Sequence, residues 1–312
     1  MKYLVTGGAG FIGSNLCRKL LVQGHSVVCL DDLSTGRRNN IKELESNPNF
    51  EFVEHDLTKP FFPDQIDGIF NLACPASPVH YQYNPIRTLK MGTLAIYNVL
   101  GMAARQDIPI LQASTSEVYG DPEEHPQNES YWGNVNPIGP RACYDEGKRV
   151  AEALCMAYHN HSGVKVRIAR IFNTFGPFMT KDDGRVVSNF IVQALNKEPL
   201  TIYGDGKQTR SFCYVDDLVE GLIRLLDTDY HLPVNLGNPI ECTIIDLAKM
   251  IGEYFDHDLE FSYHPLPIDD PVRRWPDISL AKDILNWEPQ TNLEDGLKST
   301  IKWFAELNDK NI

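Results

Sequence analysis

Hydrophobic and polar residues follow two different rhythms along the first half of the chain. Short apolar runs, typical of buried strands in a parallel sheet, occur at residues 4–6, 27–30, 51–53, 68–72, 110–113 and 166–169. Between these runs, apolar residues recur at helical spacing, as Ile12, Leu16 and Leu20 do, which is typical of one face of a helix. The two longest helical patterns cover residues 88–105 and 144–161.

This alternation predicts an α/β fold with a Rossmann-type, doubly wound parallel sheet and helices on both of its faces. After about Phe172 glycine and proline become frequent and the segments become short and mixed. We therefore expect a smaller, mixed α/β C-terminal domain that binds the substrate. The expected boundaries are 1–174 for the larger domain, with a segment near 211–237 returning to it, and 175–210 with 238–312 for the smaller one.

Composition excludes several classes of function. The net charge of −13 disfavours general binding of nucleic acid, which requires an excess of lysine and arginine. No apolar run approaches the roughly 18 residues of a membrane-spanning helix, and we expect no signal peptide before the first strand. Seven cysteines and nine histidines are scattered without the spacing of a disulfide framework or a zinc site. We expect a cytoplasmic protein with reduced cysteines, no metal site, and neither nucleic acid nor membrane as a partner.

A glycine-rich turn directly follows the first predicted strand and opens the first predicted helix. Its glycines, Gly7, Gly10 and Gly13, have the spacing GxxGxxG. Gly7 permits a tight turn, Gly10 lets the backbone approach a pyrophosphate, and Gly13 lets the helix pack closely on the sheet. The free N–H groups at the start of the helix favour phosphate there. The turn therefore predicts a dinucleotide-binding site.

An acidic residue at the end of the second predicted strand narrows this prediction to NAD. Asp31 lies 18 residues after Gly13, where a carboxylate accepts the ribose hydroxyls of NAD and repels the 2′-phosphate of NADP. The alternative is that Asp31 and Asp32 only form a turn. Asp56, after the third strand, is expected near the adenine, or else is an ordinary loop acid. The remaining expected NAD contacts are Phe11, Ile12, Asp32, Ser34, Thr35, Gly36, Leu57, Leu72, Ala73, Ala113, Tyr144, Lys148 and Thr174.

Tyr144 and Lys148 form a YxxxK pattern, which places them on one face of a helix. A phenol with a pKa of about 10 is a poor base at neutral pH, but a lysine ammonium one turn away and a positive nicotinamide favour the phenolate. Tyr144 can then accept a proton from a substrate hydroxyl while a hydride passes to NAD. Thr115, in a cluster of hydroxyl residues at a strand end, can contact the same hydroxyl.

With these features in place, the chain resembles the extended short-chain dehydrogenase/reductases that act on sugar nucleotides, and within them the UDP-glucuronate decarboxylases. The resemblance covers nearly the whole chain and depends on segments much longer than YxxxK. These segments are 72–78 (LACPASP), 113–122 (ASTSEVYGDP), 136–149 (NPIGPRACYDEGKR), 170–177 (RIFNTFGP) and 183–190 (DGRVVSNF).

The resemblance implies an NAD-dependent, redox-neutral conversion of UDP-glucuronate to UDP-xylose through a UDP-4-keto sugar. Oxidation at C4 places a ketone β to the carboxylate on C5, so CO2 can leave while the carbonyl accepts the electrons. Protonation at C5 and return of the hydride to C4 complete the cycle. Tyr144, Lys148 and Thr115 suffice for the oxidation, whereas the later steps need groups that protonate C5 and handle the carboxylate.

By the same resemblance, Ser116, Glu117 and Arg274 act around the carboxylate end of the sugar. Sugar-nucleotide 4,6-dehydratases usually carry an Asp-Glu pair where this chain has Ser116 and Glu117, so the acid that expels a C6 hydroxyl is missing. From the residues alone, a surface salt bridge is the simpler interpretation of Arg274.

The resemblance also implies a binding site for the UDP-sugar substrate, in which guanidinium groups bind phosphate oxygens. The expected contacts are Pro75, Lys90, Asn173, Arg185, Tyr203, Arg210 and Arg274. Lys90 is the least secure, because Met91, Gly92 and Thr93 depart from the Thr-Asn that usually follows it in the family.

Other functions fit the same scaffold: a 4-epimerase, a 4,6-dehydratase, or an oxidative decarboxylase that releases the 4-keto pentose with NADH. A non-catalytic NAD-binding protein would tend to lack Tyr144 or Lys148, and both are present. The family further implies a homodimer, in which residues 88–105 and 144–161 pair with their copies in a four-helix bundle.

Overall fold

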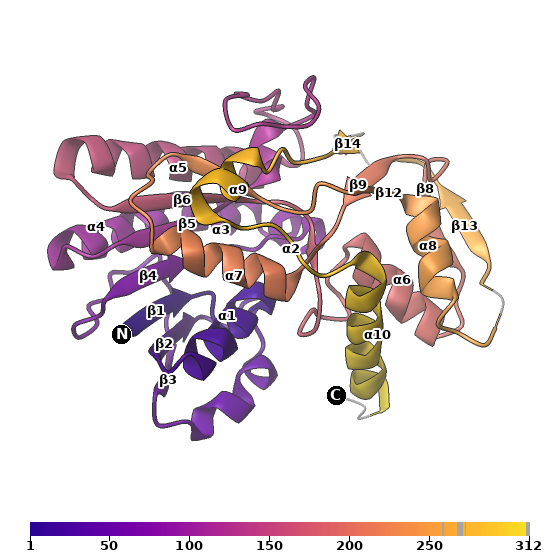
Figure 1. Ribbon diagram of the computed structural model, residues 1–312, viewed down its shortest axis with the longest axis horizontal. Coiled ribbons are helices and arrows are strands. Elements are labelled where there is room, and N and C mark those ends of the chain that lie inside the picture. The colour runs from indigo at the N-terminus through magenta and orange to yellow at the C-terminus, as the bar shows by residue number, and fades with distance from the viewer. Residues whose placement is uncertain (258, 267–270, 272, 310–312) are drawn as a thin grey trace.

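The computed structural model describes residues 1–257, 259–266, 271 and 273–309. Within this part of the chain, seven parallel strands form one sheet in the order β11-β6-β5-β4-β1-β2-β3 (Figure 1). The strands are β1 (Lys2–Thr6), β2 (Ser26–Asp31), β3 (Phe50–Glu54), β4 (Gly68–Asn71), β5 (Ile110–Thr115), β6 (Val166–Ile171) and β11 (Pro233–Leu236). The first six overlap the predicted strands. The chain order reverses between β1 and β4, the place where sheets of this type bind ligands.

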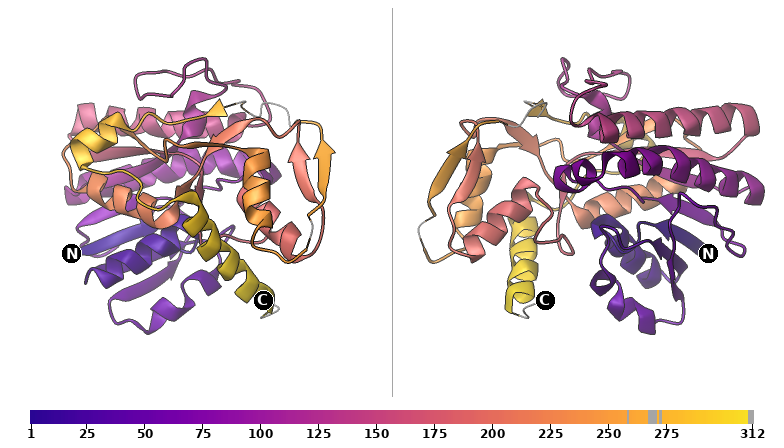
Figure 2. Two further views of the ribbon diagram at one scale, coloured as in Figure 1. Left: turned by 45° about the vertical axis from the view of Figure 1, so that its right-hand side comes forward. Right: turned by 180° about the vertical axis from the view of Figure 1, so that it is seen from behind.

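Helices cover both faces of this sheet (Figures 1 and 2). One face carries α1 (Phe11–Val22), α7 (Val215–Leu226) and α9 (Ser279–Leu285), and the other carries α4 (Ile96–Gln106) and α5 (Ala142–Ser162). Leu16 and Leu222 are fully buried on the first face, and Val99 and Cys155 on the second. The predicted doubly wound α/β fold is therefore confirmed.

The helix predicted over residues 88–105 is present as part of an unbroken helical segment, residues 85–106, but this segment is not α-helical throughout. α3 (Pro85–Lys90) leads into a π-helical turn, η3 (Met91–Ala95), before α4 begins. Gly92 in this turn packs so closely on α5 that a Cβ atom would lie 2.8 Å from the Gly147 backbone. A hydrophobic period of 3.6 residues carries no signal for the one extra residue that a π turn inserts.

The later part of the chain forms a smaller layer beside the carboxyl ends of the sheet strands (Figure 2). It has its own core, with Phe190, Leu247 and Phe304 fully buried. Its helices are α6 (Val186–Leu195), α8 (Ile244–Gly252) and α10 (Leu293–Asp309). Its strands are β7 (Thr174–Phe175), β8 (Leu200–Tyr203), β9 (Thr209–Ser211), β10 (Cys213–Tyr214), β12 (Glu241–Thr243), β13 (Phe261–His264) and β14 (Arg273–Arg274). The exact domain boundaries stay a prediction.

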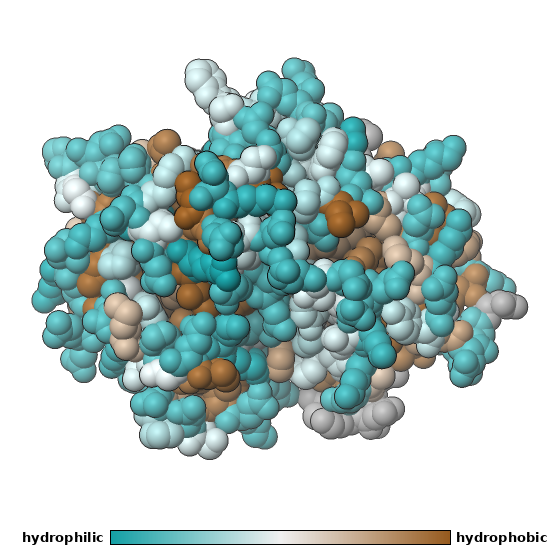
Figure 3. All heavy atoms as spheres, in the orientation of Figure 1, coloured by the Kyte–Doolittle hydropathy of each residue, from teal (hydrophilic) through white to brown (hydrophobic). Residues whose placement is uncertain are grey.

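The face of the molecule in Figure 3 is mostly hydrophilic, with hydrophobic residues in small separate patches. None of the helices in the described part of the chain is both long and apolar enough to cross a membrane. All seven cysteines are free thiols.

Candidate active site

A cavity of about 580 Å³ lies at the carboxyl ends of the sheet strands, where the smaller layer faces the sheet. It is lined by every residue predicted to contact NAD, to bind the substrate or to act in catalysis, except Asp56 and Lys90. The loops after β1, β2, β4 and β5 supply one wall, and Tyr203, Arg210 and Arg274 supply part of the other. The topology thus brings residues from distant parts of the sequence to one site.

Asp56 and Lys90 lie instead on a neighbouring cavity of about 290 Å³. The Asp56 carboxylate accepts hydrogen bonds from the backbone N and the Oγ1 of Thr58, at 3.0 and 2.8 Å. Lys90 is the last residue of α3, and its neighbour Met91, which is 8% exposed, lines the larger cavity in its place. The structure therefore does not place Asp56 or Lys90 in the main cavity, in contrast to the prediction.

The glycine turn has no room for side chains. Gly7 has a φ of +67°, and a Cβ atom there would lie 2.9 Å from the Ala73 backbone. A Cβ atom on Gly13 would lie 2.2 Å from the Gly7 carbonyl oxygen. The start of α1 has no side-chain cap on its Gly10 N-cap, so its N–H groups remain available to phosphate oxygens.

Asp31 is held rigidly at the end of β2. Its Oδ2 accepts the Ala9 N–H at 3.0 Å, and its Oδ1 accepts the Leu33 N–H at 2.9 Å. A Cβ atom on Gly36 would lie 2.7 Å from both carboxylate oxygens, so Gly36 keeps the approach to them open. Two hydrogen bonds leave further lone pairs on the carboxylate for ribose hydroxyls. Asp32, beside it, forms an ion pair with Arg87 of α3.

Tyr144, near the start of α5, is 5% exposed and hydrogen bonds to Thr115. Lys148 lies one turn further on the same helix, with Nζ 5.7 Å from the centre of the Tyr144 ring, and donates to the Ala113 carbonyl at 2.8 Å. Burial raises the pKa of Tyr144 well above its ordinary value, and the hydrogen bond from Thr115 lowers it less. The sequence-based expectation of a phenolate favoured by Lys148 is therefore not met by the protein groups alone.

A second tyrosine, which the sequence did not point to, lies against the first. The rings of Tyr81 and Tyr144 stack with centroids 4.9 Å apart and planes 5° apart. Tyr81, in α2 (Pro78–Tyr83), is 1% exposed and lines the cavity. Its hydroxyl has no hydrogen-bond partner among the described residues. Its position next to the LACPASP segment was the only available signal.

Glu117 and two arginines form a buried charged cluster in the same cavity. The Oε2 of Glu117 lies 2.5 Å from Arg141 and 3.1 Å from Arg274. Burial alone would raise the pKa of Glu117, but the guanidinium groups of Arg274 and Arg141 lower it to about 2. Arg274 is 1% exposed, so the simpler interpretation as a surface salt bridge was wrong. Arg141 was missed, although its place three residues before Tyr144 puts it near that side chain.

A further carboxyl group, Asp145, lies behind this cluster. It is 6% exposed, and its Oδ1 has no hydrogen-bond partner within the described residues. Burial and the negative charge of Glu117 raise the pKa of Asp145 to about 7. The site therefore combines a carboxylate that is kept ionised with a neighbouring carboxyl group that retains its proton to a higher pH than usual.

The rest of the cavity offers cationic groups from the smaller layer. Arg185, just before α6, pairs with Asp183 through two hydrogen bonds of 2.5 and 2.7 Å. Arg210, in β9, is 9% exposed and donates to the Pro271 carbonyl at 2.6 Å. Tyr203 is 42% exposed at the end of β8. These positions suit a ligand with phosphate groups.

Comparison with known proteins agrees with this geometry. Residues 3–237 match the model of the NAD dependent epimerase/dehydratase family. The chain is 55% identical to UDP-glucuronic acid decarboxylase 1 of Arabidopsis thaliana over 304 residues, 97% of this chain and 70% of that protein. It is also 55% identical to UDP-glucuronic acid decarboxylase 1 of Danio rerio, over 97% of this chain and 72% of that protein. The structure of UDP-glucuronic acid 4-epimerase from Bacillus cereus, in complex with UDP-glucuronic acid and NAD, is similar with a TM-score of 0.85 and 29% identity, covering 98% of this chain and 100% of that one.

Proposed function

The chain belongs to the NAD dependent epimerase/dehydratase family and, within it, to the UDP-glucuronic acid decarboxylases, and we propose that it converts UDP-glucuronate to UDP-xylose and CO2. The observation that carries this proposal is the cluster of Glu117, Arg141 and Arg274 in the same cavity as Tyr144 and Lys148. A decarboxylase needs a group that binds the carboxylate next to the groups that oxidise C4, and this cavity has both.

The residues of the cavity fit NAD. The crowded backbones at Gly7 and Gly13 leave space for a pyrophosphate and for no side chain, and Asp31 presents carboxylate oxygens beside Gly36. We assign the pyrophosphate to the turn and the start of α1, and the ribose to Asp31. Bound there, NAD would supply a reversible hydride acceptor for C4 of the sugar and a positively charged ring.

Tyr144 Oη moves the proton of the C4 hydroxyl. Lys148 holds its ammonium group under the ring of Tyr144 and is itself fixed by the Ala113 carbonyl. Burial raises the pKa of Tyr144 in the protein alone, so the positive charge of a bound cofactor would favour the phenolate. Thr115 Oγ1 orients the same hydroxyl.

Arg274 binds and orients the sugar carboxylate. Its Nε is buried without a hydrogen-bond partner in the described part of the chain, and an unpaired buried donor is costly unless a ligand satisfies it. A substrate carboxylate is such a ligand. When the C5–C6 bond breaks, its electron pair moves toward the C4 carbonyl, whose oxygen is held by Tyr144 and Thr115. Glu117, which Arg274 and Arg141 keep ionised, orients Ser116 or a water toward C5, and this group passes the proton to C5.

The test is direct assay of the purified chain with UDP-glucuronate. We expect UDP-xylose and an equal amount of CO2, with no net change in NADH, measured by chromatography of the nucleotide sugars and by trapping of CO2. NADH formed in proportion to CO2 would instead indicate an oxidative decarboxylase that releases the 4-keto pentose. Conversion to a 4-epimer without CO2 would overturn decarboxylation.

The chain further forms a homodimer through α3, η3, α4 and α5. The support is a set of apolar side chains exposed on these elements: Leu89, Leu94, Tyr97 and Val150 are 40–55% exposed. Exposed apolar side chains gathered on adjacent helices are typical of an interface, and the second copy of the same helices supplies a matching surface.

Changing Tyr97 to lysine converts the dimer to a monomer, because an ammonium group is buried unpaired at the interface. The molar mass in solution, measured by light scattering after size-exclusion chromatography, checks this result. Phe62→Lys is the matched control, since Phe62 is 73% exposed outside these helices, and it leaves the mass unchanged. A Tyr97→Lys chain with the mass of the unaltered protein would contradict the proposed interface.

We also place the chain in the cytoplasm. The support is chemical: seven free thiols, five of them buried, suit a reducing compartment in which disulfides do not form.

A further inference from the structure

The strand that carries Arg274 is too short to hold itself in place. β14 consists of Arg273 and Arg274 only, paired in parallel with Thr209 and Arg210 of β9. A two-residue ladder provides few backbone hydrogen bonds. Yet the guanidinium group of Arg274 reaches both Glu117 and the Gly120 carbonyl, at 3.1 and 2.5 Å. Contacts beyond this ladder therefore help to fix the strand: Ser211 Oγ donates to the Arg274 carbonyl at 3.3 Å, and Arg273 pairs with Glu241.

Gln127 makes a further connection, to the residue that directly follows this strand. Its backbone N–H donates to the Trp275 carbonyl at 2.7 Å, and its side-chain Oε1 accepts the Trp275 N–H at 2.7 Å. Its carbonyl accepts the Asp277 N–H at 2.8 Å. Both polar backbone groups of Trp275, the residue directly after Arg274, are thus bound by one residue. Gln127 is 0% exposed and lies outside the residues that line the main cavity.

Gln127 is itself anchored on two sides. Its Nε2 contacts the Glu124 carbonyl at 2.8 Å and the Nδ1 of His125 at 2.7 Å. Its carbonyl also accepts the Nδ2 of Asn235, in β11, at 3.0 Å. This buried residue therefore adds a second connection, through Asn235 of β11, between the strand of the active-site arginine and the seven-stranded sheet.

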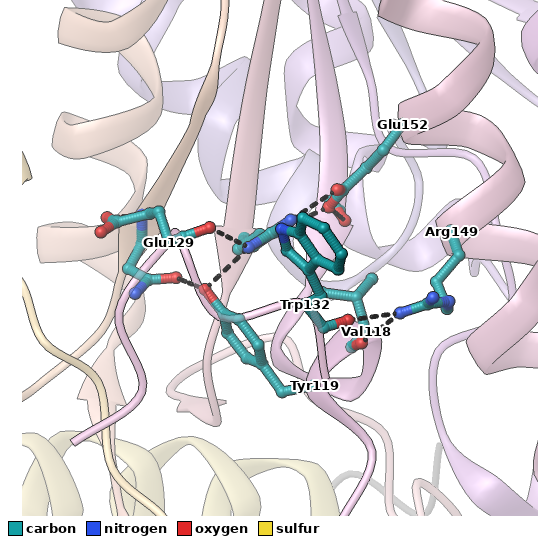
Figure 4. A network of polar contacts seen from close by, with 9 residues as sticks. Val118, Tyr119, Glu129, Trp132, Arg149 and Glu152 are labelled. Carbon is teal, nitrogen blue, oxygen red and sulfur yellow. Dashed lines mark hydrogen bonds and ion pairs between the residues drawn. The ribbon is translucent and has the colours of Figure 1, made fainter. Parts of the chain in front are cut away.

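The anchor continues into the catalytic helix through a network of buried polar groups (Figure 4). Asn235 accepts the hydroxyl of Tyr119 at 2.8 Å, and Tyr119 accepts Arg170 at 3.0 Å. Arg170 pairs with Glu152 of α5 at 2.8 Å, and Glu152 also accepts the hydroxyl of Ser114 at 2.5 Å. Figure 4 shows Arg149 of α5 donating to the carbonyls of Val118, before Gln127, and of Trp132, after it, at 3.0 and 2.8 Å. These bonds tie the segments on both sides of Gln127 to the same helix.

We propose that Gln127 is a positioning residue for carbon–carbon bond cleavage: it sets Arg274 against Glu117 and thereby aims the substrate carboxylate, without touching the sugar. The proposal rests on the proposed decarboxylase function. Cleavage of the C5–C6 bond requires this bond to stand perpendicular to the plane of the C4 carbonyl, so that its electron pair enters the carbonyl as CO2 leaves. Oxidation at C4, which uses Tyr144 and Lys148, does not depend on the orientation of the C5–C6 bond.

Loss of the Gln127 contacts is therefore expected to slow C5–C6 cleavage without slowing C4 oxidation, whereas a general loss of stability would slow both steps. In Gln127→Met the side chain keeps its length and loses both hydrogen-bonding ends. We expect CO2 release to fall by about 10- to 100-fold, the loss typical of misplacement by about 1 Å. C4 oxidation continues, so reduced cofactor accumulates on the enzyme during turnover and is visible by its near-ultraviolet absorbance. The KM for UDP-glucuronate changes by less than about threefold, because the nucleotide end of the site is untouched.

Two further variants make the test specific. Gln127→Glu keeps the acceptor for the Trp275 N–H, so its loss of CO2 release is smaller, and it carries the test if Gln127→Met does not fold. Gln193→Met is the matched control. The Gln193 amide also donates and accepts one hydrogen bond each, with Thr201, but it joins α6 to β8. We expect it to release CO2 at the rate of the unaltered protein.

The outcomes separate the two proposals. Full CO2 release by Gln127→Met, or by Gln127→Glu where that variant replaces it, would overturn the role of Gln127 alone. So would an equal loss of C4 oxidation and CO2 release, which indicates a purely structural role. If the unaltered chain releases no CO2 from UDP-glucuronate, the decarboxylase function fails, and the role of Gln127 fails with it.

Discussion

Tyr144→Phe lowers the rate of UDP-xylose formation by at least about 10³-fold, within the range that a general acid–base group contributes. The substitution removes only Oη, the atom that moves the proton of the C4 hydroxyl. The ring remains, and with it the stacking on Tyr81 at 4.9 Å. NAD content and the melting temperature therefore stay close to those of the unaltered protein, while turnover, measured as CO2 and UDP-xylose, is lost.

The matched control is Tyr3→Phe. Tyr3 and Tyr144 are both 5% exposed, but Tyr3 lies in β1 and donates its hydroxyl to the sulfur of Met1. Loss of the Tyr3 hydroxyl leaves turnover unchanged. If Tyr144→Phe kept more than about a tenth of the activity, Tyr144 would not be the proton-transfer group, because general acid–base catalysis contributes at least about 10²-fold.

The parts of the molecule that were predictable from the sequence are those that depend on local rules. Gly7 and Gly13 must be glycine because neighbouring backbone occupies the place of their Cβ atoms. Tyr144 and Lys148 share a face because they are one turn apart on one helix. The positive φ of Gly7, the contact of Gly13 with Gly7 and the spacing of Tyr144 and Lys148 are each requirements within one short segment, so the segment alone carries the signal.

The parts that were not predictable depend on contacts between distant segments. Glu117 and Arg274 are 157 positions apart and meet only because β14 is held beside the loop after β5. No local pattern indicates that Arg274 is buried, and the residues alone favoured the surface. The π turn at Gly92 likewise depends on the approach of Gly147 from another helix. The resemblance to a family supplied the role of Arg274, whereas the structure supplied its partners and the residue that holds its strand.

Arg274→Met lowers CO2 release by about 10²- to 10³-fold, the loss typical when one preorganised charged donor is removed from a reacting site. It also destabilises the fold by about 3–5 kcal/mol, because Glu117 keeps its burial and loses one of its two cations. Arg273→Met is the matched control at the next position. Arg273 pairs with Glu241, but its side chain is 38% exposed, so its loss changes stability by less than about 1 kcal/mol and leaves CO2 release unchanged.

The same substitution changes the pH dependence in a defined direction. The pKa of Glu117 is about 2, well below its ordinary value of 4.5, so its ion pairs contribute stability that is fully present above the ordinary value and is lost as the pH falls through about 2. Without Arg274, only Arg141 opposes the effect of burial, and the pKa of Glu117 rises. The acid side of the stability curve, measured by urea unfolding at a series of pH values, therefore moves to higher pH in Arg274→Met.

A double variant separates the two roles of Arg274. Adding Glu117→Gln to Arg274→Met removes the buried carboxylate that has lost one of its two cations, so the shift of the acid side of the stability curve disappears. Part of the lost stability returns, because the same change also breaks the ion pair between Glu117 and Arg141. CO2 release does not return, because the donor for the substrate carboxylate is still absent. If the double variant regained CO2 release together with stability, Arg274 would act only as a partner of Glu117, and the carboxylate would have to be bound by another group. If the double variant regained neither stability nor CO2 release, the destabilisation would come from lost packing of the arginine side chain rather than from the carboxylate left with one cation.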